Sequence, residues 1–114
     1  MKLNLHNVGD VAVVALENET ITDQKFNANI SPVLEKYKKL IFDMNQVRAI
    51  DSRGCGALLA CLRKLDSYGG ELKLCGVSIQ VYTLFELIRI HRFIEMFNSR
   101  EEAINSYQYA NSSH

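Results

Sequence analysis

The feature that most constrains the fold is a run of six apolar residues, VAVVAL at 11–16. A strand with one face in water alternates apolar and polar residues, whereas a strand buried on both faces is apolar throughout. Strands of the second kind belong mainly to parallel sheets that helices cover. The run therefore predicts a central strand of an α/β sheet. The Gly9-Asp10 pair before it predicts a hairpin with a strand that contains Leu3 and Leu5.

Four segments have the apolar spacing of helices. The first covers about 22–37, with Thr22 as its cap and Pro32 expected to kink the helix without dividing it. The second starts at Ser52 or Arg53 and is expected to end at the glycine pair 69–70.

The third and fourth helices each follow a serine. Ser78 is expected to cap a helix whose inward residues include Phe85 and Ile88. Ser99 and Glu102 predict a capping box, in which the serine bonds the third amide and the glutamate bonds back to the serine.

Strand-like segments separate these helices: LIFDM at 40–44, ELKLC at 71–75 and FIEMF at 93–97, the last expected at an edge. Strands that alternate with helices imply a mostly parallel sheet. We expect one α/β domain over residues 1–108, with a four- to five-stranded sheet, an N-terminal hairpin and about four helices. Residues 109–114 are expected to form a frayed polar tail.

The charge balance argues against several partners. Lysine and arginine number 13, aspartate and glutamate also 13, and the net charge is zero. Such a chain has no long-range attraction for nucleic acid or an anionic membrane. No apolar stretch approaches the length of a membrane span or a signal peptide. We expect no direct nucleic-acid binding, no membrane insertion and a cytoplasmic location.

The cysteines and histidines do not form a metal or disulfide pattern. Cys55, Cys61 and Cys75 are odd in number, include no CxxC pair and lie in apolar stretches. They are expected to be buried small hydrophobes in a reducing compartment. The histidines at 6, 91 and 114 lack ligand spacing, so no metal site and no cofactor are expected.

The most informative stretch is DMNQVRAIDSRGCGALL at 43–59. Ser52 lies where the chain enters the second helix, and a serine there is well suited to cap it. Gly54 and Gly56 keep the first turn free of bulky side chains, so another backbone can approach. A helix N-terminus also tolerates a phosphate. Ser52 is therefore either an ordinary cap or a phosphate acceptor beside Asp51.

The segment IDSRGCGALL at 50–59 resembles the signature of STAS domains of anti-anti-sigma factors, roughly Asp-Ser-Ser/Thr-Gly-Leu-Gly. The resemblance extends over about residues 3–107 and implies a STAS-like fold. In that family the serine after the aspartate is phosphorylated by a partner kinase, and here that serine is Ser52. The chain departs from the pattern in two places: Arg53 replaces a small hydroxyl residue, and Cys55 replaces a leucine.

The resemblance implies an anti-sigma factor antagonist that is not an enzyme and needs no cofactor. Its partner would be an anti-sigma factor with serine kinase activity, bound when Ser52 is unphosphorylated, so that a sigma factor is freed. Phosphorylation of Ser52 would separate the complex, and a metal-dependent serine phosphatase would restore it. The partner-binding residues are expected to be the six that begin the second helix: Asp51, Ser52, Arg53, Gly54, Cys55 and Gly56.

Two other functions remain open at this point. A STAS module outside sigma regulation, such as a subunit of a lipid-transport complex or a signalling scaffold, would bind its partner without a phosphate cycle. A small α/β hydrolase would use Ser52 as nucleophile with His6, His91 or Asp51. The chain lacks a G-x-S-x-G turn, which argues against the hydrolase.

Overall fold

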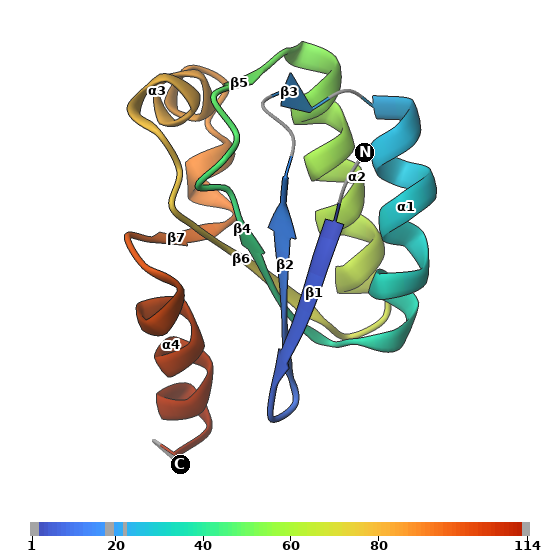
Figure 1. The fold of residues 1–114 in the computed structure, drawn as a ribbon, viewed down its shortest axis with the longest axis vertical. Helices are drawn as coiled ribbons and strands as arrows, with labels where there is room; N and C mark the ends of the chain where they lie inside the picture. Colours follow the sequence, from blue (N-terminus) through green and yellow to red (C-terminus); the bar gives the residue numbers. More distant parts are fainter. Residues whose placement is uncertain (1–2, 18–19, 22, 113–114) are drawn as a thin grey trace.

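The computed structural model describes residues 3–17, 20–21 and 23–112. Its main sheet has the strand order β1-β2-β4-β6-β7 (Figure 1). Strand β1 runs antiparallel to β2, and the other neighbouring pairs are parallel. The predicted α/β class, the mostly parallel sheet and the hairpin are confirmed. The strands are β1 (Leu3–Val8), β2 (Val11–Leu16), β4 (Lys39–Asp43), β6 (Glu71–Cys75) and β7 (Glu95–Phe97).

Strand β2 is buried on both faces, as its composition predicted. Ala12, Val14 and Leu16 belong to the larger apolar cluster on one face of the sheet. Val11 and Val13 belong to a smaller cluster on the other face. Gly9, with φ of 62°, provides the left-handed residue that the tight turn before β2 needs.

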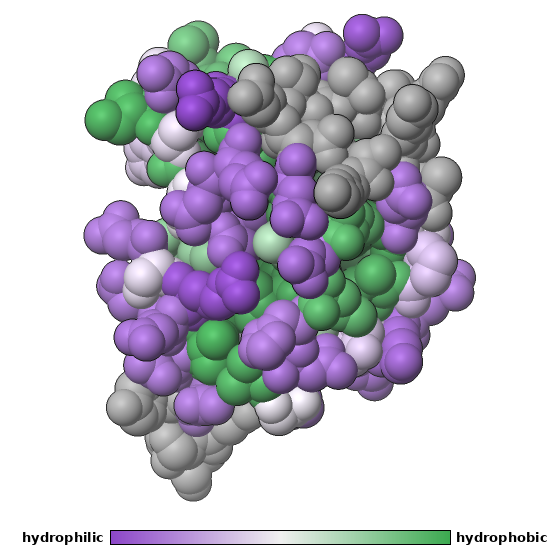
Figure 2. Space-filling view, in the orientation of Figure 1, coloured by the Kyte–Doolittle hydropathy of each residue, from purple (hydrophilic) through white to green (hydrophobic). Residues whose placement is uncertain are grey.

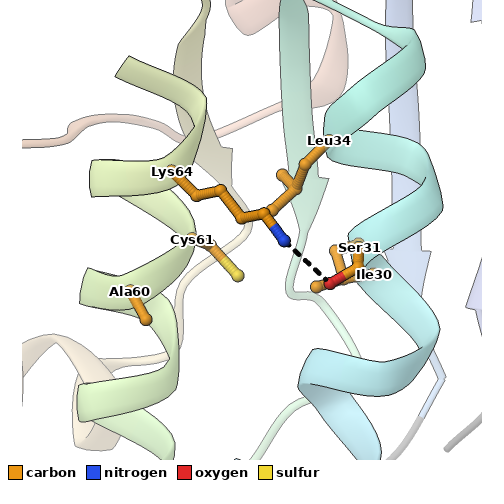
Figure 3. Close-up of a pocket in the computed structure, with 6 residues that line it drawn as sticks. All are labelled: Ile30, Ser31, Leu34, Ala60, Cys61 and Lys64. Carbon is orange, nitrogen blue, oxygen red and sulfur yellow. Dashed lines mark hydrogen bonds between the residues drawn. The ribbon is translucent and has the colours of Figure 1, made fainter. Parts of the chain in front are cut away.

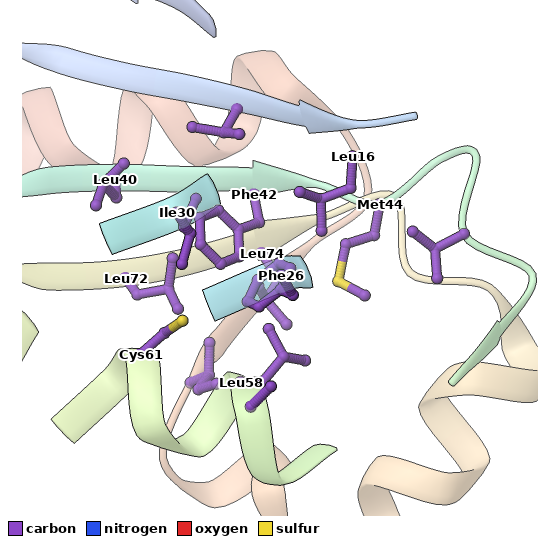
Figure 4. Close-up of a cluster of buried hydrophobic side chains, with 14 of the residues drawn as sticks. Leu16, Phe26, Ile30, Leu40, Phe42, Met44, Leu58, Cys61, Leu72 and Leu74 are labelled. Carbon is purple, nitrogen blue, oxygen red and sulfur yellow. The ribbon is translucent and has the colours of Figure 1, made fainter. Parts of the chain in front are cut away.

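Helices cover both faces of this sheet. The helical segments are α1 (Asp23–Lys36), α2 (Ser52–Ser67), α3 (Ile79–Leu87), the 3₁₀ helix η1 (Ile90–Arg92) and α4 (Arg100–Ser112). Figure 4 shows the larger cluster, where α1 and α2 pack on the sheet. Phe26 of α1 meets Phe42 of β4 edge-on there, with ring centroids 5.8 Å apart. Helix α4 packs Ala103 and Tyr107 on the opposite face.

Helix α1 continues through its proline, as expected. Pro32 lies inside the helix, and the buried residues Phe26, Ile30 and Leu34 keep one helical phase across it. The predicted cap, Thr22, lies outside the described residues.

Around α3, one sequence expectation is confirmed and two were wrong. Ser78 caps α3 as predicted, because its Oγ accepts a hydrogen bond from the amide of Val81 at 3.2 Å. Ile88, however, is exposed and does not point inward, because α3 ends at Leu87 and the helical period no longer applies. The edge strand begins at Glu95 and not at Phe93, since the unpredicted η1 occupies the preceding residues.

A second small sheet was not predicted. Strands β3 (Thr20–Ile21) and β5 (Ala49–Ile50) pair in parallel, and β5 ends directly before Asp51. Two-residue strands are too short to show an alternating pattern in sequence.

At the start of α4, Ser99 and Glu102 are linked in both directions, as the predicted capping box requires. Ser99 Oγ accepts a hydrogen bond from the amide of Glu102 at 3.1 Å. The Ser99 hydroxyl in turn donates a hydrogen bond to the carboxylate of Glu102 at 3.2 Å, so the glutamate bonds back to the serine through its side chain. Since α4 extends to Ser112, the predicted domain end at residue 108 falls inside this helix and stays a prediction.

Candidate functional site

The predicted site lies where α2 begins, directly after β5. The helix is capped by Asp51, whose backbone is extended and whose Oδ1 accepts a hydrogen bond from the amide of Gly54 at 2.8 Å. The expectation that Ser52 is the cap was therefore wrong. Both residue types cap helices well, but Asp51 precedes the first helical residue and satisfies the third amide.

This arrangement leaves Ser52 as the first residue of α2, and its side chain is exposed. Its hydroxyl is not needed to close the helix, because Asp51 has that role. The remaining amides of the first turn and the helix dipole favour negative charge at this end. A phosphate on Ser52 would therefore meet a favourable local field from the helix itself.

The six predicted partner-binding residues separate into two groups. Ser52, Arg53 and Gly56 are exposed and Asp51 is half-buried, so these four share the surface at the start of α2. Gly54 and Cys55 are buried beneath them, where Cys55 joins the larger apolar cluster. The first group can thus contact a partner directly, whereas the second group is buried and can only hold the first group in place.

Gly56 is exposed although the helix does not require a glycine there. A Cβ built on this residue would have no heavy atom within 4 Å. Its φ is not left-handed either, unlike that of Gly9. A glycine inside a helix costs about 1 kcal/mol relative to alanine. Within the described residues, no feature of the fold requires a glycine here and so compensates for this loss of stability. The glycine is explained if another molecule packs closely on this turn.

Two charges flank Ser52. The Arg53 guanidinium lies 3.6 Å from the carboxylate of Asp51, and 70% of the Arg53 side chain is exposed. The hydrogen bond from the amide of Gly54, helped by the nearby Arg53, holds the pKa of Asp51 below its usual value. Asp51 is therefore ionised at neutral pH, and a phosphate added to Ser52 would lie beside a negative charge.

The cysteines are buried free thiols, as predicted. Burial raises the pKa of Cys55, and the negative charge of Asp51 raises it further. Burial likewise raises the pKa of Cys61 and of Cys75 to about 12. Thiolate chemistry at the start of α2 is therefore disfavoured, although a helix N-terminus alone would promote it.

Sequence reasoning missed a partly buried ion pair that fixes the end of β4. Asp43 accepts hydrogen bonds from Arg100 at 2.6 and 3.1 Å and from the amide and side chain of Asn45 at 3.0 and 2.6 Å. Burial raises the pKa of Asp43, but these hydrogen bonds outweigh it and the net pKa lies below the usual value. The pair anchors the connection that leads to Ser52. Its only sequence signal was an arginine in the first turn of α4, where the helix dipole disfavours cations.

A hollow lies between α1 and α2. It holds about 190 Å³, and six residues line it: Ile30, Ser31, Leu34, Ala60, Cys61 and Lys64 (Figure 3). Lys64 reaches across it to the hydroxyl of Ser31 at 3.4 Å.

The described residues contain neither a metal-binding cluster nor a membrane-spanning helix. Over 3–17, 20–21 and 23–112, no group of three His, Cys, Asp or Glu residues is arranged to hold a metal ion. In the same residues, no helix combines the length and the apolar character that crossing a membrane requires.

The chain is similar in sequence to proteins of a known family. A family model described as STAS domain matches residues 3–103. A protein of Bordetella bronchiseptica, BtrV, provisionally named an anti-sigma factor antagonist, is 23% identical over 113 residues, or 96% of this chain and 97% of BtrV.

Solved structures have the same fold. The anti-sigma factor antagonist SpoIIAA in its unphosphorylated form superposes with a TM-score of 0.77 at 21% identity, over 94% of this chain and 96% of that one. The phosphorylated form of SpoIIAA from Bacillus gives 0.70 at 20% identity, over 93% and 99%. A variant of RsbS from Moorella thermoacetica gives 0.81 at 17% identity, over 98% and 99%. At these identities the likeness shows a shared fold alone.

Proposed function

Because this chain belongs to the STAS domain family, we propose that it is an anti-sigma factor antagonist whose partner binding is switched by phosphorylation of Ser52. One observation carries the proposal: Asp51 caps α2, so that Ser52 is exposed at the helix start with no capping role of its own. The structural and sequence relatives that are named anti-sigma factor antagonists support the general role.

In the unphosphorylated state the start of α2 binds an anti-sigma factor that has serine kinase activity, and a sigma factor is released. The exposed Gly56 lets the partner backbone approach this turn. The chain itself is a binding protein without catalytic groups, acts in the cytoplasm and holds no cofactor.

The kinase ends the interaction by modifying Ser52. The Ser52 Oγ forms a bond to the γ-phosphorus of ATP, the bond from that phosphorus to the bridging oxygen of ADP breaks so that ADP leaves, and the hydroxyl proton passes to a base of the kinase. The product carries about −1.5 to −2 additional charge at pH 7 beside the ionised Asp51. A partner that desolvates this surface would have to bury an unpaired charge, which is costly. A metal-dependent serine phosphatase hydrolyses the phosphoester and restores binding.

The two departures from the family pattern differ in how much they change the partner surface. Cys55 is buried in the core, so its replacement of a leucine changes the partner surface little. Arg53 is exposed and lies within 3.6 Å of Asp51, so its guanidinium can turn to a phosphate on Ser52 and partly neutralise it. We expect Arg53 to reduce the electrostatic effect of the phosphate without abolishing it.

The direct test is phosphorylation by the cognate kinase, isolated from the native host with this chain as bait and identified by mass spectrometry. With ATP, the wild-type chain should gain one phosphate, located on Ser52 by fragmentation, and Ser52→Ala should gain none. Ser67→Ala is the matched control, because Ser67 is an exposed serine at the other end of α2 and its loss should change nothing. A phosphate found only on Ser31, Ser67 or Ser78 would contradict the proposal. Binding without any phosphate would indicate a fixed docking module instead.

A further inference from the structure

The most exposed large apolar side chains of the described residues lie on α3, in the turn that follows it and directly after η1. The exposed fractions are 82% for Ile79, 75% for Leu87, 68% for Phe93 and 46% for Ile88, against 43% for Leu5 on β1. Figure 2 shows hydrophobic atoms at the surface over α3, at the upper left of the view. A group of this kind on the surface of a domain marks an interaction site.

The segment that carries these residues is fixed to the core. Buried side chains lie on both sides of the exposed Phe93 in the sequence: Phe85 of α3 and Ile90 of η1 before it, and Ile94 directly after it. The turn between α3 and η1 requires Arg89 in a left-handed conformation, with φ of 66°. Phe93 therefore faces outward because the anchored backbone directs it there, and it cannot turn inward without unpacking its neighbours.

Phe93 forms one wall of a groove against α2. The groove holds about 280 Å³, and Leu62, Arg63 and Asp66 of α2 line it together with Phe93. Its apolar walls are Phe93 and the half-buried Leu62. A groove between two elements with an aromatic wall suits an apolar side chain presented by a partner helix.

The Arg63 wall of this groove lies on the same side of α2 as Ser52. Ser52, Gly56, Leu59 and Arg63 follow one another at steps of four, three and four residues, which places them along one side of α2. Arg63 lies about 16 Å along the helix axis from Ser52. A partner helix of about three turns that lies along this side would therefore reach from the phosphate acceptor to the groove.

The charges around the groove favour an acidic partner. Arg63 and Asp66 line the groove and balance each other in charge. Beside it, Arg89 and Arg92 at η1 are exposed against Glu86 of α3, which leaves the surface one positive charge in excess. A segment that places carboxylates beside an apolar anchor complements this surface in charge as well as in shape.

We propose that the partner that covers Ser52 also lays an acidic amphipathic helix along α2 and seats an apolar side chain against Phe93 in the groove. This inference rests on the proposed function, because the same partner has to span both places. A lipid surface fits less well, since the groove is concave and carries Asp66.

The test is calorimetric titration of the cognate kinase into variants made on a Ser52→Ala chain, which cannot be phosphorylated. Phe93→Ala should weaken binding about 10-fold or more, as loss of a central aromatic anchor does. Leu5→Ala, which removes an exposed apolar side chain from β1, should stay within about 2-fold. Arg63→Glu should weaken binding about 5-fold or more, whereas Lys64→Glu should not. That pair makes the same charge change on neighbouring residues, and Lys64 faces the hollow at α1.

The outcomes separate this inference from the proposed function when Ser52→Asp is titrated alongside. If Ser52→Asp loses affinity and both Phe93→Ala and Arg63→Glu stay within 2-fold of the parent chain, the inference is overturned and the switch stands. If only the groove variants lose affinity, the groove binds a partner that does not cover Ser52, and both proposals are wrong as stated.

A lipid ligand is tested with vesicles of phosphatidylglycerol and phosphatidylcholine. We expect the wild-type chain to stay in the supernatant after sedimentation. Co-sedimentation that requires phosphatidylglycerol and is lost in Phe93→Ala would overturn the assignment of the groove to a protein partner.

Discussion

Gly56→Ala should stabilise the fold and weaken the complex at the same time. The substitution adds one methyl group to the second turn of α2, at an exposed position with an ordinary helical φ. A Cβ there has no heavy atom within 4 Å, so the methyl group meets open space in the free chain. An opposite effect on folding and on binding would identify a position that is kept for a partner.

The magnitude follows from helix propensity. Replacing an interior helix glycine by alanine is worth about 0.8–1 kcal/mol, and neither a clash nor a left-handed φ offsets it here. For a chain of 114 residues this corresponds to a rise in Tm of about 3–6 °C. If the partner packs on this turn, the methyl group overpacks the interface by about 1–3 kcal/mol. That is a loss of about 5-fold to 150-fold in affinity.

Chemical denaturation gives the first quantity and calorimetric titration of the cognate kinase gives the second. Ala60→Gly is the matched control, since Ala60 is exposed on the same helix but lines the hollow at α1. It should lose about 1 kcal/mol of stability and keep its affinity within about 2-fold. A loss of stability in Gly56→Ala would refute the reasoning about the fold. A stabilised Gly56→Ala chain with unchanged affinity would refute the reasoning about the partner.

Three further predictions concern stability and reactivity. Ser52→Ala should change the free energy of unfolding by less than about 0.5 kcal/mol, because Asp51 is the cap; a loss well above 1 kcal/mol in urea denaturation would make Ser52 structural. Asp43→Asn should cost about 2–4 kcal/mol at pH 7. The folded pKa of Asp43 is lowered, so the ionised carboxylate stabilises the fold above the unfolded pKa of about 4, and this stabilisation is lost as pH falls through the folded pKa. The difference in free energy of unfolding between wild type and Asp43→Asn should therefore shrink at about pH 3. An undiminished difference there would contradict the assignment. The three thiols should react slowly with a thiol reagent at about pH 8 in the folded chain and fully in denaturant; rapid labelling of Cys55 in the folded chain, located by fragmentation, would show that this thiol is accessible.

The sequence was sufficient for the elements with strong local signals. The all-apolar run at 11–16 predicted a strand buried on both faces, and the structure places it between β1 and β4. The phase of Phe26, Ile30 and Leu34 predicted one helix through Pro32. In these cases the pattern is repeated over several residues, so one exception does not change the interpretation.

The errors arose where the signal is short or distant. Asp51 and Ser52 are both good caps, and only the backbone conformation at Asp51 decides between them. Strands β3 and β5 have two residues each and form only because the chain brings them together. Arg100 lies 57 residues from Asp43, and no local pattern connects two such residues.

The affinity of Ser52→Asp for the cognate kinase tests the central claim most directly. The substitution adds one negative charge beside Asp51 at a residue that the partner should cover. An uncompensated charge in an interface costs about 2–5 kcal/mol, or about 30-fold to several thousand-fold in affinity, and the lower end is expected because Asp carries less charge than phosphate. Ser52→Ala should bind within about 3-fold of the wild type, since only a hydroxyl is lost. If Ser52→Asp also binds within about 3-fold, the interface does not cover the start of α2 and the switch is contradicted.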